Sequence, residues 1–373
     1  MNKIIWISAA VLSVAACAKN EPLRDTTADA EVTYAVAPKT KGDGTASTHQ
    51  EFTKTNVFAS WAYYLPGDET WPGETTPSLY IDGAEIAYRE KTTGSTEKVW
   101  KAANKTYYWP KNGSLTFFAY SLNRNNLNFN VDNENNQFTY FHCYSNTGIT
   151  GQINLDSDPN VDFLVAEIAK EKRFNEENTY YVNGVPTLFK HKLSWIVFNV
   201  KADSYNGKTF NLKSIKFKNV SHQATYCQVP TGSNPGGFKP TTIPNKPDVV
   251  YMNSEQVIPT DKLTEVTKKE HWLYIPQTFV QGSDDTKHAY IEVKYTITTT
   301  VPVITNEEPS AKKVVEEVTK KIFLYPATGT PMFEKWEMGK KYTINLTFTL
   351  DEILWDPAVE DWEDGTTAGQ TVA

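Results

Sequence analysis

Short runs in which apolar and polar residues alternate recur along the whole chain, and they limit what the chain can fold into. In residues 341–350 every second side chain is apolar or aromatic, and in residues 213–220 Ile215 and Phe217 alternate with polar residues. A period of two predicts strands with one buried and one solvated face. Aromatic residues make up 13% of the chain, which also favours strands. We therefore predict an all-β chain built of β-sandwiches.

The first 17 residues have the layout of a secretory signal peptide. Lys3 provides a basic start, an uncharged and mostly apolar run follows, and small residues lead into Cys17. The run is too short for a permanent membrane-spanning helix. Its end, with cleavage between Ala16 and Cys17, resembles the lipobox of bacterial lipoproteins, in which the cysteine receives a diacylglycerol. The alternative is an ordinary signal peptide that contains a cysteine.

The remaining chain is long enough for about two domains. We predict a signal peptide over residues 1–16, a lipid-anchored tether over 17–30, an N-terminal β-sandwich over 31–195 and a C-terminal β-sandwich over 196–373. Four side chains lie in the most apolar runs and are expected to be buried. They are Trp109, Phe117, Trp195 and Phe198.

The two cysteines of the mature domains, Cys143 and Cys227, are the only possible disulfide pair, and export permits one. They lie far apart in the sequence and in different predicted domains. Neither belongs to a C-x-x-C motif, so no thiolate metal site is indicated. We expect two unpaired, partly buried thiols.

One motif resembles a metal-binding loop. Residues 156–162 and Glu167 match the ligand spacing of a helix-flanked calcium loop. Val161 stands where that loop needs a glycine, and a strand follows, so a polar turn is the expected structure. No zincin, phosphate-binding or nucleophile-elbow motif occurs. We predict no catalytic residues, no metal, no cofactor and no enzymatic activity.

Charge and aromatic residues bear on the possible partners. The net charge is −7 and no basic stripe is present, so a nucleic-acid partner is not expected. Trp61, Trp71, Trp100 and Trp109 could stack on sugar rings. Cross-strand packing in a sandwich core is the expected role for most of them.

Seven segments resemble, in this order, the fimbrillin-like proteins of Bacteroidetes, the subunits of lipoprotein-derived (type V) pili. They are the lipobox ending at Cys17 and residues 58–63, 107–121, 162–166, 189–200, 272–279 and 336–348. The resemblance covers most of the mature chain. It implies two tandem transthyretin-like β-sandwich domains and a lipid-anchored protein at the cell outer membrane, surface-exposed as part of a fimbrium.

The resemblance also implies a mechanism of assembly. A trypsin-like protease cuts after a basic residue behind the first strand, and that strand leaves. A strand of the next subunit then fills the opened groove, which is β-strand addition. Head-to-tail contacts of this kind give an open filament. The implied partners are other pilus subunits and, through the lipid, the outer membrane; a host surface protein or glycan is a further candidate.

Carried onto this sequence, the leaving strand is best matched by residues 31–37. The candidate cleavage residues are Lys39 and Lys41, which follow it, and Arg24, which precedes it. The proteases of the best-known pili in the family are arginine-specific, whereas this loop holds only lysines, so the cleavage site stays open. The candidate donor is the C-terminal region, whose first apolar side chains are Tyr342, Ile344, Leu346, Phe348 and Leu350, with residues 353–355 and 359–362 behind them.

Two classes of function remain open from the sequence. The first is a structural and adhesive pilus subunit, either of the shaft or of the tip. The second is a non-polymerising surface lipoprotein that binds glycans. The pilus hypothesis needs a removable first strand, and the glycan hypothesis needs several exposed, coplanar aromatic rings.

Overall fold

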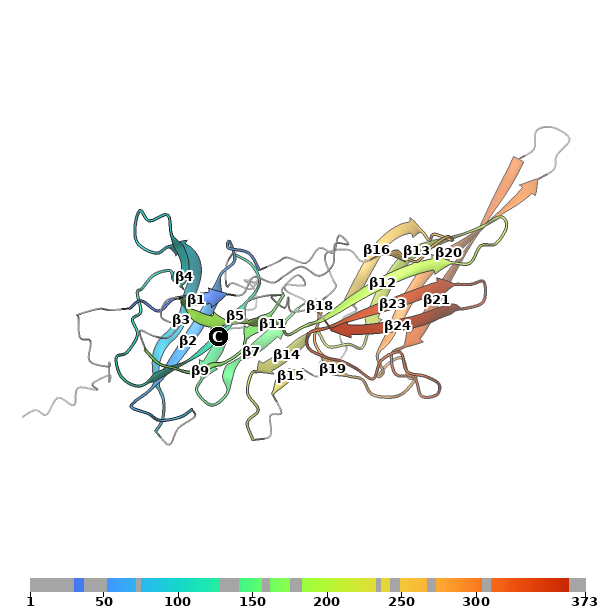
Figure 1. Ribbon diagram of the computed structural model, residues 1–373. Coiled ribbons are helices and arrows are strands. Elements are labelled where there is room, and N and C mark those ends of the chain that lie inside the picture. The colour runs from blue at the N-terminus through green and yellow to red at the C-terminus, as the bar shows by residue number, and fades with distance from the viewer. Residues whose placement is uncertain are drawn as a thin grey trace, which may run out of the picture.

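The computed structural model describes residues 30–36, 52–71, 75–125, 127, 141–155, 162–174, 183–232, 236–241, 249–266, 273–303 and 310–361. These residues form 24 β-strands, which confirms the predicted all-β class (Figure 1). Within these ranges no helix is long and apolar enough to cross a membrane.

The first and largest sheet lies in the N-terminal lobe. Its order is β10-β1-β4-β3-β2-β5-β8-β11, and β9 pairs with β5. The bounds are β1 (Tyr34–Val36), β2 (Phe58–Leu65), β3 (Ser78–Glu90), β4 (Lys98–Ala102), β5 (Ser114–Ser121), β8 (Leu164–Ala166), β9 (Ala169–Lys172), β10 (Val185–Thr187) and β11 (Phe189–His191).

This sheet curls around an apolar interior. In the sheet order, β1 and β5 are separated by β4, β3 and β2, yet the ring of Tyr34 on β1 lies 6.0 Å from that of Phe117 on β5. Phe58 on β2 likewise lies 5.3 Å from Phe189 on the edge strand β11. The curl therefore encloses a core to which β1, β2, β4, β5, β8, β10 and β11 all contribute.

A second sheet covers the outer face of β2 and β5. Its order is β15-β14-β7-β6, with bounds β6 (His142–Tyr144), β7 (Gly148–Asn154), β14 (Gln223–Cys227) and β15 (Gly237–Pro240). Apolar residues of both sheets, such as Trp61, Phe118 and Ile149, share one core. Because both faces of β2 and β5 are covered, these two strands are among the most deeply buried of the lobe.

The C-terminal lobe is a sandwich of two further sheets. The third sheet has the order β17-β12-β23-β24, with β18 on β12, and the fourth has the order β16-β13-β20-β21. A small fifth sheet pairs β19 with β22. The bounds are β12 (Ser194–Ala202), β13 (Lys208–Lys218), β16 (Val249–Val257), β17 (Thr264–Glu265), β18 (Leu273–Tyr274), β19 (Gln277–Thr278), β20 (Tyr290–Val303), β21 (Ser310–Phe323), β22 (Lys335–Trp336), β23 (Lys340–Phe348) and β24 (Ile353–Asp361).

Strand β12 connects the two lobes because its faces belong to different cores. Trp195 and Val197 pack with the first and second sheets, whereas Ile196 and Phe198 pack between the third and fourth. The predicted burial of Trp109, Phe117, Trp195 and Phe198 is confirmed. The division at residue 195 stays a prediction; β14, which follows it in the chain, pairs with β7, which precedes it.

At two places, pairing with distant strands decides the local structure. Residues 310–321, whose charges resemble a helical pattern, form β21 because they pair along their whole length with β20. The turn at Gly113 does not join a hairpin: β5 pairs with β2, β8 and β9, and Tyr108 bridges to Glu31 instead. Gly113 has φ +79°, and a Cβ there would lie 2.2 Å from the carbonyl oxygen of Leu65, so the turn packs tightly onto the end of β2.

Candidate functional site: the first strand and its groove

The predicted leaving strand is paired inside the first sheet. Of the predicted residues 31–37, Tyr34–Val36 form β1 between β4 and β10. The pairing with β10 is parallel, with Tyr34 opposite Val185 and Val36 opposite Thr187, and the pairing with β4 is antiparallel at Trp100. The first strand thus fills a slot with a hydrogen-bonding edge on each side.

The side chains before and within β1 alternate between the interior and the surface. Val32 and Tyr34 are buried in the core of the curl, and Thr33 and Ala35 between and after them are half-buried. The ring of Tyr34 meets Phe58 edge-on at 5.4 Å, and its hydroxyl donates a 3.0 Å hydrogen bond to Oγ of Ser60. Burial raises the pKa of the Tyr34 hydroxyl well above its usual range. The hydroxyl therefore stays protonated and donates this hydrogen bond.

Further main-chain hydrogen bonds hold the residues around β1, beside those within its pairs with β4 and β10. The N–H of Val32 donates to the carbonyl of Tyr107 at 2.8 Å, and the N–H of Trp109 donates to the carbonyl of Ala30 at 2.9 Å. The N–H of Val185 donates to the carbonyl of Thr33 at 2.8 Å. Each such bond contributes about 0.5–1.5 kcal/mol net, and burial of an apolar side chain such as that of Val32 contributes about 1.5–3 kcal/mol.

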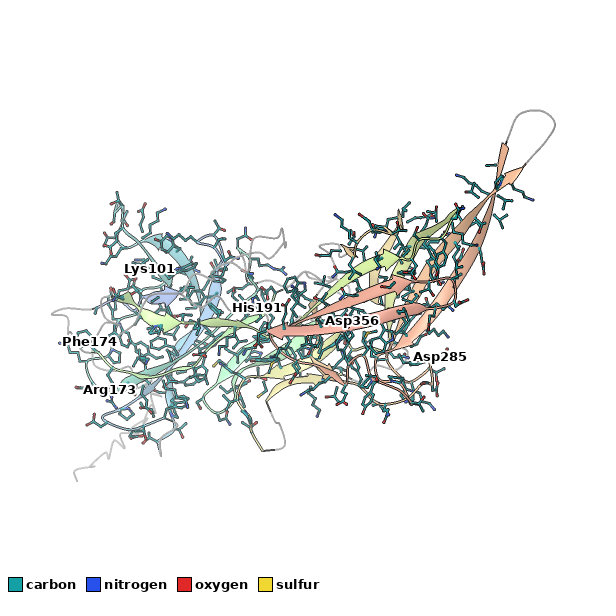
Figure 2. All side chains as sticks on the ribbon, turned by 45° about the vertical axis from the view of Figure 1, so that its right-hand side comes forward. Lys101, Arg173, Phe174, His191, Asp285 and Asp356 are labelled. Carbon is teal, nitrogen blue, oxygen red and sulfur yellow. The ribbon has the colours of Figure 1, made fainter. Side chains whose placement is uncertain are left out.

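One ion pair joins the residues before β1 to the neighbouring strand β4. Nζ of Lys101 on β4 lies 3.2 Å from Oε2 of Glu31, and both side chains are largely shielded from solvent. Figure 2 labels Lys101 in the N-terminal lobe. The pair and the three main-chain bonds all engage residues at or beside β1, so removal of this short segment would break them together.

Gly184 shapes the slot on the β10 side. Its φ is +89°, a backbone conformation that favours glycine. A Cβ at this position would lie 2.6 Å from the carbonyl carbon of Tyr34. The backbone of β1 therefore passes so close to residue 184 that no side chain fits between them.

The candidate donor residues lie in the middle of the third sheet. Strand β23 pairs in parallel with β12 and antiparallel with β24. Four of the predicted side chains are buried in the C-terminal core and the fifth, beyond the end of the strand, is exposed; in order these are Tyr342, Ile344, Leu346, Phe348 and Leu350. Their alternation is as expected, while their role as a donor stays a prediction.

The last strand, β24, lies at the edge of the same sheet. It pairs residue by residue with β23, from Phe348 opposite Ile353 to Lys340 opposite Asp361. Ile353 is buried, whereas Leu354 and Val359 are exposed. Ion pairs at its far end join Lys340 to Asp361 and Lys341 to Glu360. Of the candidate donor strands β23 and β24, β24 is therefore the one that can leave without opening the centre of a sheet.

Several predicted sites lie outside the described residues. These are Ala16 and Cys17 of the lipobox and the candidate cleavage residues Arg24, Lys39 and Lys41. They stay predictions.

The candidate calcium residues that are described contact other parts of the protein. Oδ1 of Asp162 lies 2.8 Å from Nδ1 of His191, and Oδ2 accepts a hydrogen bond from the side chain of Asn123 at 3.0 Å. Oε1 of Glu167 lies 2.6 Å from Nζ of Lys190. Within the described ranges, no three His, Cys, Asp or Glu side chains gather in a way that could hold a metal ion.

Cys143 and Cys227 are free, as expected, and both are buried rather than partly buried. Cys143 on β6 and Cys227 on β14 flank β7, where they lie opposite Ile149 and Thr150. Two interstrand spacings separate them by about 9–10 Å, beyond the ~7 Å that a disulfide can bridge. Burial raises the pKa of the Cys143 thiol, which keeps it protonated and unreactive.

The tryptophans are mostly core residues. Trp61, Trp100 and Trp109 are buried, and Trp71 is half-buried against Tyr63 and Phe118. Among the described residues with large apolar side chains, Tyr144 is the one aromatic residue that is strongly exposed. On the described surface, therefore, no two large aromatic side chains are both strongly exposed.

Comparison with known proteins identifies the family. Residues 44–362 match the family described as Fimbrillin-like. A fimbrial protein from Bacteroides vulgatus has a TM-score of 0.57 at 17% identity, with 89% of this chain and 99% of that chain covered. This likeness shows a shared fold.

Two further solved structures are similar to this chain at lower TM-scores. A fimbrial assembly protein from Parabacteroides distasonis is 14% identical with a TM-score of 0.35, covering 91% of this chain and 98% of that chain. The tip fimbrial protein Mfa3 from Porphyromonas gingivalis is 11% identical with a TM-score of 0.34, covering 82% and 94%. No curated protein matches the sequence. On the family match, which spans most of the sequence, this chain belongs to the fimbrillin-like family.

Proposed function

We propose that this protein is a structural and adhesive subunit of a lipoprotein-derived pilus, and that it assembles by protease-triggered strand exchange. The observation that carries the proposal is β1: a strand of three residues, at the N-terminal end of the described chain, seated between two strand edges over an apolar core. Removal of this segment leaves β2, β3, β4, β5, β8, β9 and β11 paired with one another and frees the edges of β4 and β10.

Loss of β1 would leave a groove that water solvates badly. The side chains of Val32 and Tyr34 fill the interior of the curl, and their departure exposes Phe58, Phe117 and Val185. Burial of one such side chain is worth about 1.5–3 kcal/mol, so the empty groove favours any strand that restores the contacts. An incoming strand also regains main-chain hydrogen bonds along the exposed edges.

The C-terminal strand that best fits the role of donor is β24. Its residues Ile353, Trp355, Pro357 and Val359 offer apolar side chains at every second position. It can leave the third sheet from the edge, whereas β23 would have to leave the centre and withdraw four buried side chains. In our proposal β24 is the strand that inserts into the groove of another subunit. The predicted donor residues from Tyr342 onward, which form β23, take part only if a longer stretch of chain leaves the third sheet.

The proposal places the protein at the surface of the outer membrane before assembly. The lipid on Cys17 anchors it, and residues 18–30 serve as the tether. The partners are other subunits of the pilus and, for adhesion, a host surface protein or glycan. The role is structural and requires no enzymatic activity or cofactor. The burial of Trp61, Trp100 and Trp109 favours it over a monomeric glycan-binding protein.

Limited proteolysis of the purified precursor tests the proposal. Trypsin is expected to cut after Lys39 or Lys41, because this polar, glycine-containing stretch is a typical site of nicking. The cut protein should then form SDS-resistant ladders, with cut sites read by mass spectrometry. A Lys39→Gln, Lys41→Gln variant is the matched control and should stay uncut in this loop and monomeric.

A truncation identifies the donor. A chain that ends at Asp351 lacks β24 and should be cut normally but form no ladders, whereas a chain that ends at Asp361 should form them. Cut protein that stays monomeric at high concentration would contradict the proposal.

A further inference from the structure

The C-terminal lobe carries a long two-stranded arm with an unpaired edge. Strands β20 and β21 pair over 14 residues each, and Figure 1 shows their far ends projecting beyond the other strands of the lobe. Among the described strands, β21 pairs only with β20 and is the last strand of the fourth sheet. A long free edge is a template for another strand, and proteins protect such edges unless they use them.

The side chains of β21 on the core side form a self-complementary series. Val318 and Ile322 pack against the C-terminal core, and period two places Val314, Glu316 and Lys320 on the same face. Read in opposite directions, two copies of this series match when Val318 faces its own counterpart. Glu316 then faces Lys320 and Val314 faces Ile322, each twice.

The charges in this series differ from those on the opposite face of the same strand. On the opposite face, Lys321 is paired with Asp285, and Oε2 of Glu317 lies 3.6 Å from Nζ of Lys213. Within the described residues Glu316 has no ion pair, and Lys320 donates to the main-chain carbonyl of Asp351 at 2.7 Å without meeting a carboxylate. Two opposite charges on the core-side face are thus left without a counter-charge.

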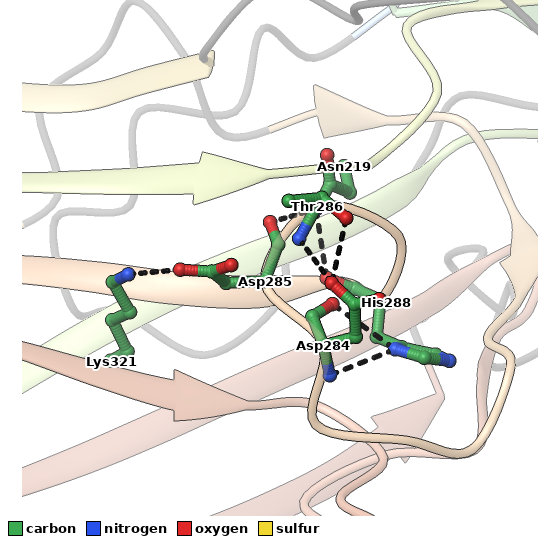
Figure 3. A network of polar contacts seen from close by, with 6 residues as sticks. All are labelled: Asn219, Asp284, Asp285, Thr286, His288 and Lys321. Atoms are coloured by element: carbon green, nitrogen blue, oxygen red, sulfur yellow. Dashed lines mark hydrogen bonds and ion pairs between the residues drawn. The ribbon is translucent and has the colours of Figure 1, made fainter.

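The base of the arm is held firmly. Figure 3 shows Lys321 bound to Asp285 in the turn before β20, and this turn is tied to Asn219, whose side chain donates to the carbonyls of Asp285 and His288 at 2.9 and 3.0 Å. The turn is further closed by two hydrogen bonds from Thr286 to Oδ1 of Asp284. Such an anchor presents the edge of β21 in one orientation.

The outer part of the arm exposes apolar side chains as well. Val314 and Val315 are 49% and 61% exposed, and Val301 on β20 is 44% exposed. Val301 and Val314 lie diagonally across the strand pair, because Val301 is opposite Lys312 and Thr299 is opposite Val314. A second strand laid beside β21 would cover Val314 with an apolar side chain.

We propose that two copies of this protein pair antiparallel along β21, with Val318 on the two-fold axis. The pairing joins the two fourth sheets into one continuous sheet. On the core-side face, each side of the axis then holds one ion pair of Glu316 with Lys320 of the second copy and one apolar contact of Val314 with Ile322, and the ion pairs decide the register. The contact uses neither β1 nor β24. It is therefore available to the uncut precursor, and in a pilus it would join subunits side by side.

Charge reversal tests the pairing with the uncut, full-length chain carrying Cys17→Ala to remove the lipid. Glu316→Lys places two lysines opposite each other at both ends of the contact, and Lys320→Glu does the same with two glutamates. Each variant alone should dimerise at least about tenfold more weakly than the parent in analytical ultracentrifugation, since like charges directly opposite one another are destabilising. An equimolar mixture of the two variants restores both attractive pairs and should dimerise as the parent does.

Cross-linking tests the register. Val318→Cys should form a disulfide-linked dimer on mild oxidation, because residues directly opposite each other in an antiparallel pair have Cα atoms about 4.5–5.5 Å apart. Val314→Cys is the matched control on the same face, since the two copies of this residue would lie ~27 Å apart. A monomeric parent, a mixture that fails to dimerise, or a cross-link at residue 314 in place of 318 would overturn the proposal. Because no cut is made, these outcomes are independent of strand exchange.

Discussion

Replacement of Tyr34 by alanine is expected to weaken the packing of β1 against the N-terminal lobe more than any other single change in this strand. The ring is buried and touches Phe58 and Phe117, so its removal leaves a cavity that costs about 3–5 kcal/mol. Tyr34→Phe keeps the ring and loses only the hydrogen bond to Ser60, which is worth about 0.5–1.5 kcal/mol. Ser60 keeps the carbonyl of Phe118 as its own acceptor.

Two assays separate the effect on stability from the effect on assembly. In the uncut precursor, urea denaturation should show the N-terminal lobe of Tyr34→Ala unfolding at a clearly lower concentration, with Tyr34→Phe in between. In the cut protein, β1 should leave more readily, because every 1.4 kcal/mol shifts the equilibrium tenfold. Ladders should therefore appear faster in the order Ala, Phe, Tyr.

Tyr144→Ala is the matched control. This tyrosine is 53% exposed on β6, and a surface substitution of this kind changes stability by only about 0.5 kcal/mol. Equal denaturation midpoints for Tyr34→Ala and Tyr144→Ala would refute the assignment of Tyr34 as the main anchor of β1. A destabilised Tyr34→Ala that forms ladders no faster than the parent would refute the link between anchoring and assembly.

Three further changes have defined outcomes. Cys17→Ala should abolish labelling by a fatty acid in cells and leave the rest of the fold intact. Gly184→Ala should lower the thermal midpoint of the N-terminal lobe and loosen β1, because the new Cβ would lie 2.6 Å from the carbonyl carbon of Tyr34 and φ is +89°. Hydrogen bonds from Thr286 lower the pKa of Asp284 to about 2. The ionised carboxylate therefore stabilises the folded state above pH ~4, and this contribution is lost as the pH falls from ~4 to ~2. Thr286→Ala should raise the pKa of Asp284 towards its usual 3.8 in an NMR titration.

Local alternation predicted much of the architecture. The apolar positions of β23 follow from its period of two, and all four that lie within the strand are buried. Trp109, Phe117, Trp195 and Phe198 are buried for the same reason. The alternation predicted that a face of each strand is buried. It did not predict which sheet buries that face, and Trp195 and Phe198, three residues apart, belong to different cores.

Pairing between distant segments could not be predicted in this way. The parallel register of β1 with β10 joins Tyr34 to Val185, and that of β12 with β23 joins Trp195 to Lys341. Such registers depend on how whole faces fit together, which no local window contains. The same holds for β21, whose Lys and Glu residues fit a helical pattern locally and whose strand conformation is set by its partner β20.

The candidate site was only partly accessible from the sequence. The family resemblance matched the leaving strand to residues 31–37 and supplied its role. The tight passage at Gly184, the ion pair of Glu31 with Lys101 and the edge position of β24 come from the three-dimensional arrangement. Of these three features, the one at Gly184 is visible in the local sequence, as a glycine directly before the apolar residue Val185.

The central claim, that release of β1 permits assembly, is tested most directly by locking this strand in place. Ala35 and Pro186 are direct partners in the parallel pair of β1 and β10, so their Cα atoms lie about 5 Å apart, within the range of a disulfide. In the Ala35→Cys, Pro186→Cys variant, protein cut behind β1 should stay monomeric when oxidised and form SDS-resistant ladders once a reductant is added. Ladders of equal intensity with and without the reductant would contradict the account.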